Sequence, residues 1–337
     1  MVHTNASMNQ APAAARISIT DRCDLACIYC RPAQHDPCLP RERRLDVSSW
    51  KAVFRALAAQ GVHRLRFTGG EPLLHPDVVQ IVQVAHETAG IDDIALTTNG
   101  MRLESLAKPL HDAGLSRLNV SVDSINEARF RAITRGGNLT QVLHGIRTAC
   151  DVGFREVKTN TVVMGSGDNH TLRNDDELVE ITEWAWSQGI TPRFIELMPI
   201  GIGGEIQNQL VTYRRMREIL VCLLGTNDME GVVDQQRGPA RYVMAENGSG
   251  SRIGFITGTT QPFCDGCDRI RVTANGEVRA CLARMDCVNV AEAARSCDAD
   301  GLARSLQEAW AHKPDTTSWR GSSETSARRV SMRVIGG

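Results

Sequence analysis

Strand-like runs alternate with helical patterns over most of the chain, from Arg16 to about residue 211. The runs rich in apolar and β-branched residues cover positions 16–20, 63–68, 94–98, 117–122, 157–164 and 192–198, and apolar residues at helical spacing fill the intervals. Strands that alternate with helices form a parallel sheet with right-handed crossovers. Six such units fit a partial barrel as well as an open doubly wound sheet, and the pattern alone does not separate the two.

The regular alternation of strand-like and helical patterns ends after about residue 212, which predicts a second, smaller domain. A helical pattern over 213–224 is followed by strand-like runs at 252–257 and 269–274 and by a helix near 301–311. The opening fifteen residues are small and polar, as is typical of a disordered arm. We therefore expect an arm over 1–15, an α/β domain over 16–211 and a carboxy-terminal domain over 212–337.

The eleven cysteines indicate metal or thiol chemistry rather than disulfides. The first fifteen residues lack the charged and then apolar order of a signal peptide, and no stretch reaches the roughly 18 apolar residues of a membrane span. We expect a cytoplasmic protein, because thiols stay reduced there and clustered cysteines bind metal or catalyse reactions. The net charge of −1 gives no bulk reason to expect a nucleic acid or a membrane surface as partner.

Three thiols lie within eight residues directly after the first strand-like run, at Cys23, Cys27 and Cys30. Three thiolates fill three corners of a four-iron cluster and leave the fourth iron open to a small molecule. Loops after strands lie at the carboxyl face of a parallel sheet, where active sites concentrate. The alternative is structural zinc, which needs a fourth ligand from Cys38 or a distant histidine.

The segment Gly69-Gly70-Glu71-Pro72 follows the second strand-like run. Glycines allow a close backbone approach to a ligand, and a carboxylate suits an ammonium group. Together with the CxxxCxxC spacing, this segment resembles the radical S-adenosylmethionine superfamily. The resemblance implies a cluster on the three cysteines and contacts to S-adenosylmethionine at Tyr29, Gly70, Glu71, Ser121 and Met198.

Cys264, Cys267 and Cys281 form a second trio. Three ligands again suggest a cluster with an open iron, here available to a substrate. Cys287 would complete a four-thiolate zinc site, and the spacing alone leaves these two alternatives nearly balanced. Outside the two trios, the remaining cysteines are expected to be packing or surface residues: Cys38, Cys150, Cys222, Cys287 and Cys297.

The residues around the second trio resemble one family, the GTP 3′,8-cyclases of molybdenum cofactor biosynthesis. The similarity extends from Arg16 to Gly337 and includes Thr20-Asp21-Arg22, Gly238-Pro239-Ala240, Gln261-Pro262-Phe263, Arg269-Ile270-Arg271-Val272-Thr273, Arg279-Ala280-Cys281-Leu282 and Gly336-Gly337. It implies a partial (β/α)6 barrel with a smaller carboxy-terminal iron–sulfur domain, whose second four-iron cluster binds the substrate. Two positions depart from the family pattern: Arg64 stands where Lys is common, and Asp268 where Asn is common.

Basic residues lie in or beside the strand-like runs. Strand interiors of α/β proteins are usually apolar, and a buried cation without a counter-charge costs several kcal/mol. Such residues either point outward and pair locally, or line a cavity and meet an anion, whose phosphate oxygens arginine binds bidentately. The resemblance favours the cavity and implies contacts to GTP at Arg16, Arg66, Thr97, Lys158, Arg193, Arg269 and Arg271.

The resemblance also implies the reaction. An electron from the first cluster cleaves S-adenosylmethionine, and the 5′-deoxyadenosyl radical takes hydrogen from the 3′ carbon of the GTP ribose, which then adds to C8 of guanine. Arg16 is expected to assist the final reduction, and the terminal Gly336 and Gly337 to reach into the active site. The implied partners are an external one-electron reductant and the next pathway enzyme, cyclic pyranopterin monophosphate synthase; a homodimer is left open.

Two other functions fit parts of the sequence. A related radical enzyme that acts on another nucleotide or on a peptide would share the first motif, although peptide-modifying relatives usually carry more cysteines. A scaffold that binds zinc or a cluster without catalysis would leave Glu71 and the strand arginines without a role.

Overall fold

The computed structural model describes residues 11–31, 38–166, 172–225, 238–246, 248, 250–264, 266–314 and 332–335. Its strands are β1 (Ala14–Ser18), β2 (Arg64–Thr68), β3 (Asp93–Thr98), β4 (Arg117–Ser121), β5 (Glu156–Val163), β6 (Thr191–Glu196), β7 (Arg241–Met244), β8 (Arg252–Ile256), β9 (Arg269–Val272), β10 (Glu277–Arg279) and β11 (Val288–Asn289). Its helices are α1 (Val47–Ala59), α2 (Val78–His86), α3 (Leu103–Asp112), α4 (Glu127–Thr134), α5 (Leu139–Val152), α6 (Leu178–Ser187), α7 (Tyr213–Ile219), α8 (Val221–Leu224), α9 (Ala291–Arg295), α10 (Ala299–Ala311) and α13 (Met332–Ile335).

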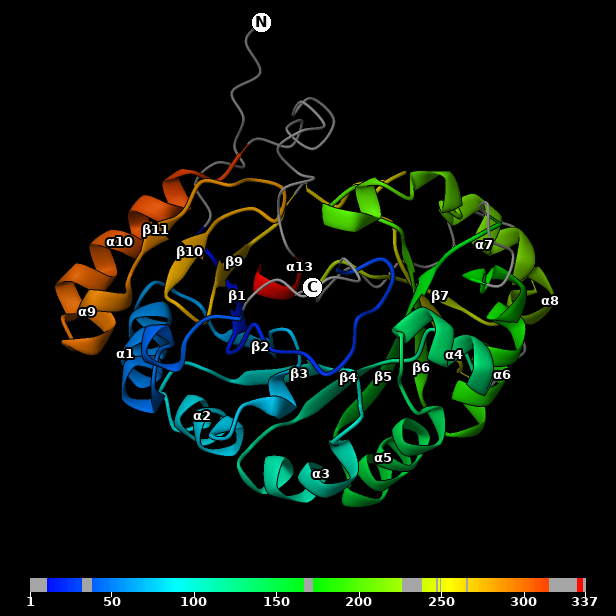
Figure 1. Cartoon of the computed structure of the whole chain (residues 1–337), viewed down its shortest axis with the longest axis horizontal. Helices are drawn as coiled ribbons and strands as arrows, with labels where there is room; N and C mark the ends of the chain where they lie inside the picture. The colour runs from blue at the N-terminus through cyan, green and yellow to red at the C-terminus, as the bar shows by residue number, and fades with distance from the viewer. Residues whose placement is uncertain are drawn as a thin grey trace, which may run out of the picture.

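All of these strands belong to one sheet, in the order β11-β10-β9-β1-β2-β3-β4-β5-β6-β8-β7. Strands β1 to β6 lie side by side in chain order, each parallel to the next, as the alternation predicts. Figure 1 shows this sheet curved around a hollow, with α1, α2, α3, α5 and α6 on its outer side. The sheet is therefore an open, partial barrel and not a doubly wound sheet, the alternative that the sequence pattern also allowed.

The second half of the chain extends the same sheet at both edges. Strand β8 adds to β6 and β9 adds to β1, both in parallel, and the antiparallel strands β7, β10 and β11 complete the edges. Because β9 pairs directly with β1, the segment after Cys267 lies beside the first strand of the barrel. Because the two strands are parallel, Cys267 lies beside the amino end of β1, whereas Cys23 follows the carboxyl end of β1, so the two trios lie at opposite ends of the hollow.

The main core lies between the sheet and its outer helices. Apolar residues of the strands, such as Ile17 and Phe67, are fully buried against Trp50 and Phe54 of α1. Fully burying one such side chain stabilises the fold by about 1.5–3 kcal/mol. This layer fixes the strands, so that their other face is free to carry polar side chains into the hollow. No helix of the described residues is long and apolar enough to cross a membrane.

Helix α1 begins at a side-chain cap. The carboxylate of Asp46 accepts hydrogen bonds from the backbone N–H of Ser49 at 2.8 Å and from the hydroxyl of Ser48 at 2.9 Å, and these bonds lower its pKa. We expect Asp46→Ala to lower the free energy of unfolding of the apoprotein by about 1 kcal/mol, measured by urea denaturation. Asp46→Asn retains a hydrogen-bond acceptor and should therefore lose less of the free energy of unfolding than Asp46→Ala.

The pH dependence of that loss follows from the direction of the pKa shift. Because the carboxyl pKa of Asp46 is lower in the folded chain, its contribution is present above the unfolded value of 3.8 and fades as the pH falls through the folded value. An equal difference between the parent and Asp46→Ala at pH 7 and in strong acid would contradict the capping role.

Candidate active site

One cavity of about 300 Å³ opens in the hollow of the sheet. It is lined by residues at or just beyond the carboxyl ends of several strands, and by side chains from within β1, β2, β6 and β9. All six cysteines of the two trios line it: Cys23, Cys27, Cys30, Cys264, Cys267 and Cys281. Residues that are more than 230 positions apart in the sequence therefore share one space.

The first trio lies on a loop that packs against the end of α4. A turn places the N–H of Cys30 2.9 Å from the carbonyl of Cys27, and the loop N–H groups of Ala26 and Ile28 donate to the last carbonyls of α4. Arg135 follows in the left-handed conformation, at φ 53°, and its guanidinium donates to the carbonyls of Ala26 and Arg31. Helix α4, which the sequence pattern did not reveal, thus holds the loop in place.

The Gly69-Gly70-Glu71 segment lies directly against the segment after β1 that leads to the first trio. The N–H of Gly70 donates to the carbonyl of Thr20, and that of Glu71 to the carbonyl of Arg22, both at 2.7 Å. The Glu71 carboxylate is buried and accepts from the N–H groups of Leu73 and Asn99 and from the Thr98 hydroxyl. Burial raises the pKa of Glu71 to about 7, although these three donors favour the ionised form.

Acidic neighbours surround the first trio. Burial raises the pKa of the Cys23 thiol to about 12, and burial together with Asp123 raises the pKa of the Cys27 thiol well above its ordinary value. The hydroxyl of Tyr29 donates to Asp123 at 2.6 Å, and burial raises the pKa of that carboxyl to about 6. Because the thiolates are disfavoured here, a cation must compensate them, and metal binding would release protons.

The second trio has the opposite electrostatic environment. A turn joins the N–H of Cys267 to the carbonyl of Cys264 at 3.0 Å. Burial disfavours the Cys267 thiolate, but Arg269 and Lys313 outweigh burial and lower the pKa of the thiol to about 7. The cavity therefore has an acidic end at the first trio and a cationic region at the second.

Both trios carry features of a thiolate site for a cluster. The sulfur of Cys23 accepts the N–H of Leu25 at 3.4 Å, and the sulfur of Cys281 accepts the N–H of Ala283 at 3.5 Å. Among the described residues, no group of three or more Cys, His, Asp and Glu side chains converges closely enough to hold a single metal ion. A four-iron cluster is larger than one ion and accepts three thiolates spread around a cavity, so the donor set fits a cluster better than mononuclear zinc.

A row of arginines crosses three neighbouring strands. Arg16 of β1 lies in register with Arg66 of β2 on one side and with Arg271 of β9 on the other, and all three line the cavity. Residues in register on parallel strands point to the same face. Burial lowers the pKa of each, and repulsion from neighbouring arginines, Arg269 among them, lowers it further. Arg271 is buried and Arg16 and Arg66 are half-buried, so these three neighbouring cations are expected to attract an anion into the cavity.

Arg193 of β6 also lines the cavity. Its guanidinium donates to the side-chain oxygen of Asn119 at 2.5 Å, while its Nε atom is buried without a hydrogen-bond partner among the described residues. Gly254 of β8 leaves room for this side chain, since a β carbon there would lie 2.6 Å from the Arg193 Cγ atom. A buried donor without a partner is expected to bind an acceptor of a ligand.

Lys158 differs from the other basic residues of the predicted set. Its ammonium group lies 2.8 Å from Glu156 and 5.1 Å from the ring centre of Tyr242, and it is not among the residues that line the cavity. The two family departures, Arg64 and Asp268, form an ion pair with each other across β2 and the start of β9. Arg in place of Lys keeps the positive charge, so the carboxylate that Asp268 adds has a cationic partner in Arg64.

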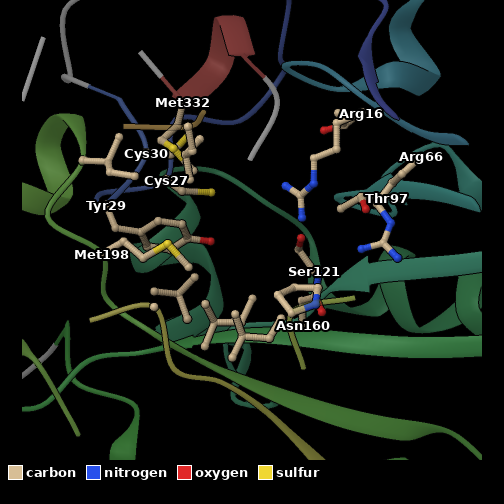
Figure 2. Close-up of a pocket in the computed structure, with 18 of the residues that line it drawn as sticks. Arg16, Cys27, Tyr29, Cys30, Arg66, Thr97, Ser121, Asn160, Met198 and Met332 are labelled. Carbon is tan, nitrogen blue, oxygen red and sulfur yellow. The ribbon is translucent and has the colours of Figure 1, made fainter. Parts of the chain in front are cut away.

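The remaining predicted residues line the cavity as well: Tyr29, Gly70, Thr97, Ser121, Met198 and Arg269. In Figure 2, Cys27, Cys30, Tyr29, Met198 and Met332 gather on one side, and the guanidinium groups of Arg16 and Arg66 lie on the other. Residues that sequence reasoning missed are Asn99, Asp123, Asn160 and Lys313. Asn99 and Asp123 lie just beyond the carboxyl ends of β3 and β4, where the active-site residues of parallel sheets concentrate, so their positions could have indicated a role. The position of Lys313 in the sequence gives no such indication.

The end of the chain returns to the cavity. Ser18 of β1 donates to the carbonyl of Val334 at 2.9 Å, Arg271 donates to that of Ile335 at 3.4 Å, and Ile335 is buried. Helix α13 lies within the hollow of the sheet in Figure 1. Gly336 and Gly337 lie outside the described residues, so their entry into the site stays a prediction.

Comparison with known proteins identifies the class first. The family model of the radical SAM superfamily matches residues 17–185, the part of the chain that carries the first trio and Glu71. The fold and this site therefore define a radical S-adenosylmethionine protein, whose superfamily uses a four-iron cluster with S-adenosylmethionine. A second family model, Molybdenum Cofactor Synthesis C, matches residues 190–319, which contain the second trio.

Close relatives narrow the class to a family. The chain is 38% identical over 306 residues to the GTP 3′,8-cyclase of Lactiplantibacillus plantarum, covering 89% of this chain and 87% of the relative. It is 36% identical over 324 residues to GTP 3′,8-cyclase 1 of Pseudomonas aeruginosa, covering 96% and 95%. The chain belongs to the GTP 3′,8-cyclase family, as the sequence resemblance implied.

Solved structures confirm the fold. Streptococcus suis SuiB bound to the precursor peptide SuiA superposes with a TM-score of 0.63 at 14% identity, over 92% of this chain and 66% of SuiB. The chain thus spans slightly less than two thirds of SuiB. At this identity the likeness shows a shared architecture and carries no information on substrate.

Proposed function

We propose that this chain converts GTP to (8S)-3′,8-cyclo-7,8-dihydroguanosine 5′-triphosphate in the cavity between its two cysteine trios. The observation that carries the proposal is the shared cavity: two thiolate trios line it, with five arginines of β1, β2, β6 and β9 between them. Without an anionic substrate, these neighbouring, largely buried cations would lack a counter-charge. A triphosphate supplies the missing charge, and arginine binds it bidentately.

The first trio and the residues beside it form the S-adenosylmethionine half of the site. Cys23, Cys27 and Cys30 would hold a four-iron cluster, which supplies the electron that cleaves S-adenosylmethionine to a carbon radical. Glu71 would accept the methionine ammonium, since its buried carboxylate faces the cavity. Tyr29, fixed by Asp123, together with Ser121 and Met198, would orient the rest of the molecule.

The second trio and the arginines form the substrate half. Cys264, Cys267 and Cys281 would hold the cluster that binds guanine. Arg16, Arg66, Arg271 and Arg193 would bind and orient the triphosphate, with Thr97 and Arg269 also lining the cavity. Arg16 lies in the middle of the row, so it is the residue placed best to move a proton in the final reduction. Lys158 would join the set only by releasing Glu156.

The proposal also covers the roles of the two domains, the source of electrons and the fate of the product. We assign the radical chemistry to residues 16–211 and substrate binding to 212–337, with the terminal glycines reaching the substrate. An external one-electron reductant would serve the first trio in the cytoplasm. The product would pass to cyclic pyranopterin monophosphate synthase.

Anaerobic reconstitution tests the proposal. The protein is supplied with iron and sulfide, then with S-adenosylmethionine, dithionite and one nucleoside triphosphate at a time. We expect about eight irons per chain and formation of 5′-deoxyadenosine that depends on GTP, measured by chromatography. Cleavage that is equally fast with ATP, or without any nucleotide, would contradict GTP as the substrate.

A further inference from the structure

Lys313 lies two residues beyond α10, and its ammonium group reaches the second trio. The Nζ atom is 2.8 Å from the carbonyl oxygen of Ala280, 3.0 Å from that of Arg269 and 3.3 Å from the sulfur of Cys267. The ring centre of Trp310, in the last turn of α10, lies 4.9 Å from the same atom. This aromatic face supports the ammonium from the side of the helix.

The three acceptors match the three N–H donors of a lysine ammonium group. Two of them are backbone carbonyls that cannot move without moving a cysteine: Ala280 precedes Cys281, and Arg269 follows Cys267 by two residues. Lys313 therefore joins the two segments that carry the ligands of the second trio. Because its donors are engaged in this way, it differs from Arg16 and Arg66, whose guanidinium groups face the cavity.

We propose that Lys313 is a positioning residue that sets the reduction potential of the second cluster. The proposal rests on the assignment of a cluster to Cys264, Cys267 and Cys281. An N–H group that donates to a ligand sulfur draws electron density from it and stabilises the reduced cluster, as does a nearby positive charge. Lys313 supplies both to Cys267 and holds the Cys267 and Cys281 segments at a fixed separation.

The test isolates the second cluster. In a Cys23→Ala, Cys27→Ala, Cys30→Ala parent, reconstitution loads only the second trio with about four irons per chain. Its midpoint potential is measured by redox titration followed by electron paramagnetic resonance, in the parent and in Lys313→Met. We expect the Lys313→Met cluster to have a more negative potential. Lys108→Met serves as the matched control, because Lys108 is exposed on α3 and, within the described part of the chain, its ion pair is with surface Asp112.

Two further variants keep the proposal testable if Lys313→Met loads iron poorly. Lys313→Gln retains an N–H donor without the charge, and Lys313→Arg retains the charge in a planar group that cannot reach three converging acceptors. We expect both to give potentials between those of the parent and Lys313→Met, and to release iron to a chelator faster than the parent.

Two results would overturn the proposal, and they are distinguishable. If the iron-loaded Lys313 variants have the same cluster potential and the same rate of iron release as Lys108→Met, the role of Lys313 is rejected and the second cluster is retained. A parent that holds no iron would reject the second cluster, and the role of Lys313 with it.

Discussion

Cys27→Ala is expected to halve the iron content of the reconstituted enzyme, from about eight to about four irons per chain, and to abolish cleavage of S-adenosylmethionine. Cys27 is the central thiol of the first trio, and the turn from its carbonyl places Cys30. Burial and Asp123 raise the pKa of its thiol well above the ordinary value, so a thiolate at this position is stable only with a metal. Formation of 5′-deoxyadenosine under strong reductant measures the loss.

Two matched variants sharpen this result. Cys264→Ala should also lose about four irons but should keep the first cluster and its ability to bind S-adenosylmethionine, since Cys264 lies in the other trio. Cys38→Ala should change neither quantity, because Cys38 is exposed and belongs to neither trio. Undiminished cleavage by Cys27→Ala would reject the first cluster site.

The sequence predicted the barrel strands well, because buried parallel strands and amphipathic helices leave strong patterns. Helices α1, α2, α3, α5 and α6 lie in the intervals where apolar residues recur at helical spacing, and β2 to β6 lie within two residues of the expected runs. Helix α4 was missed, since its eight residues bury only Phe130, Ile133 and Thr134 and show little periodicity. Strand β7 was missed because it is a short edge strand with one exposed apolar residue, Met244.

Pairing between distant segments could not be predicted from local pattern. Neither the parallel pairing of β9 with β1 nor the resulting row of Arg16, Arg66 and Arg271 can be derived from spacing along the chain. The cysteine trios were recognisable because ligand spacing is local. Lys313 was not, since it lies 46 residues from the sulfur that it contacts.

Gly70→Ala is expected to disable the enzyme although it removes no functional group. A β carbon at Gly70 would lie 2.6 Å from the carbonyl carbon of Arg22 and 2.8 Å from the carbonyl oxygen of Asp21, with the Arg22 oxygen closer still. These are backbone atoms, so they cannot rotate away. The backbone must shift, at a cost of about 1–3 kcal/mol or more for such overpacking, read from urea denaturation of the apoprotein.

The shift would also move the active site. Residues 21 and 22 lead directly into Cys23, and the N–H of Glu71 donates to the Arg22 carbonyl, so the displacement separates the first trio from Glu71. Gly70→Ala should therefore weaken binding of S-adenosylmethionine, measured by calorimetry, beyond its effect on stability. Gly153→Ala is the control: this left-handed glycine has open space around it, so it should cost about 1–2 kcal/mol of backbone strain and leave binding unchanged. Equal binding by the Gly70→Ala and Gly153→Ala proteins would show that the close approach of Gly70 to Arg22 does not align the two halves of the site.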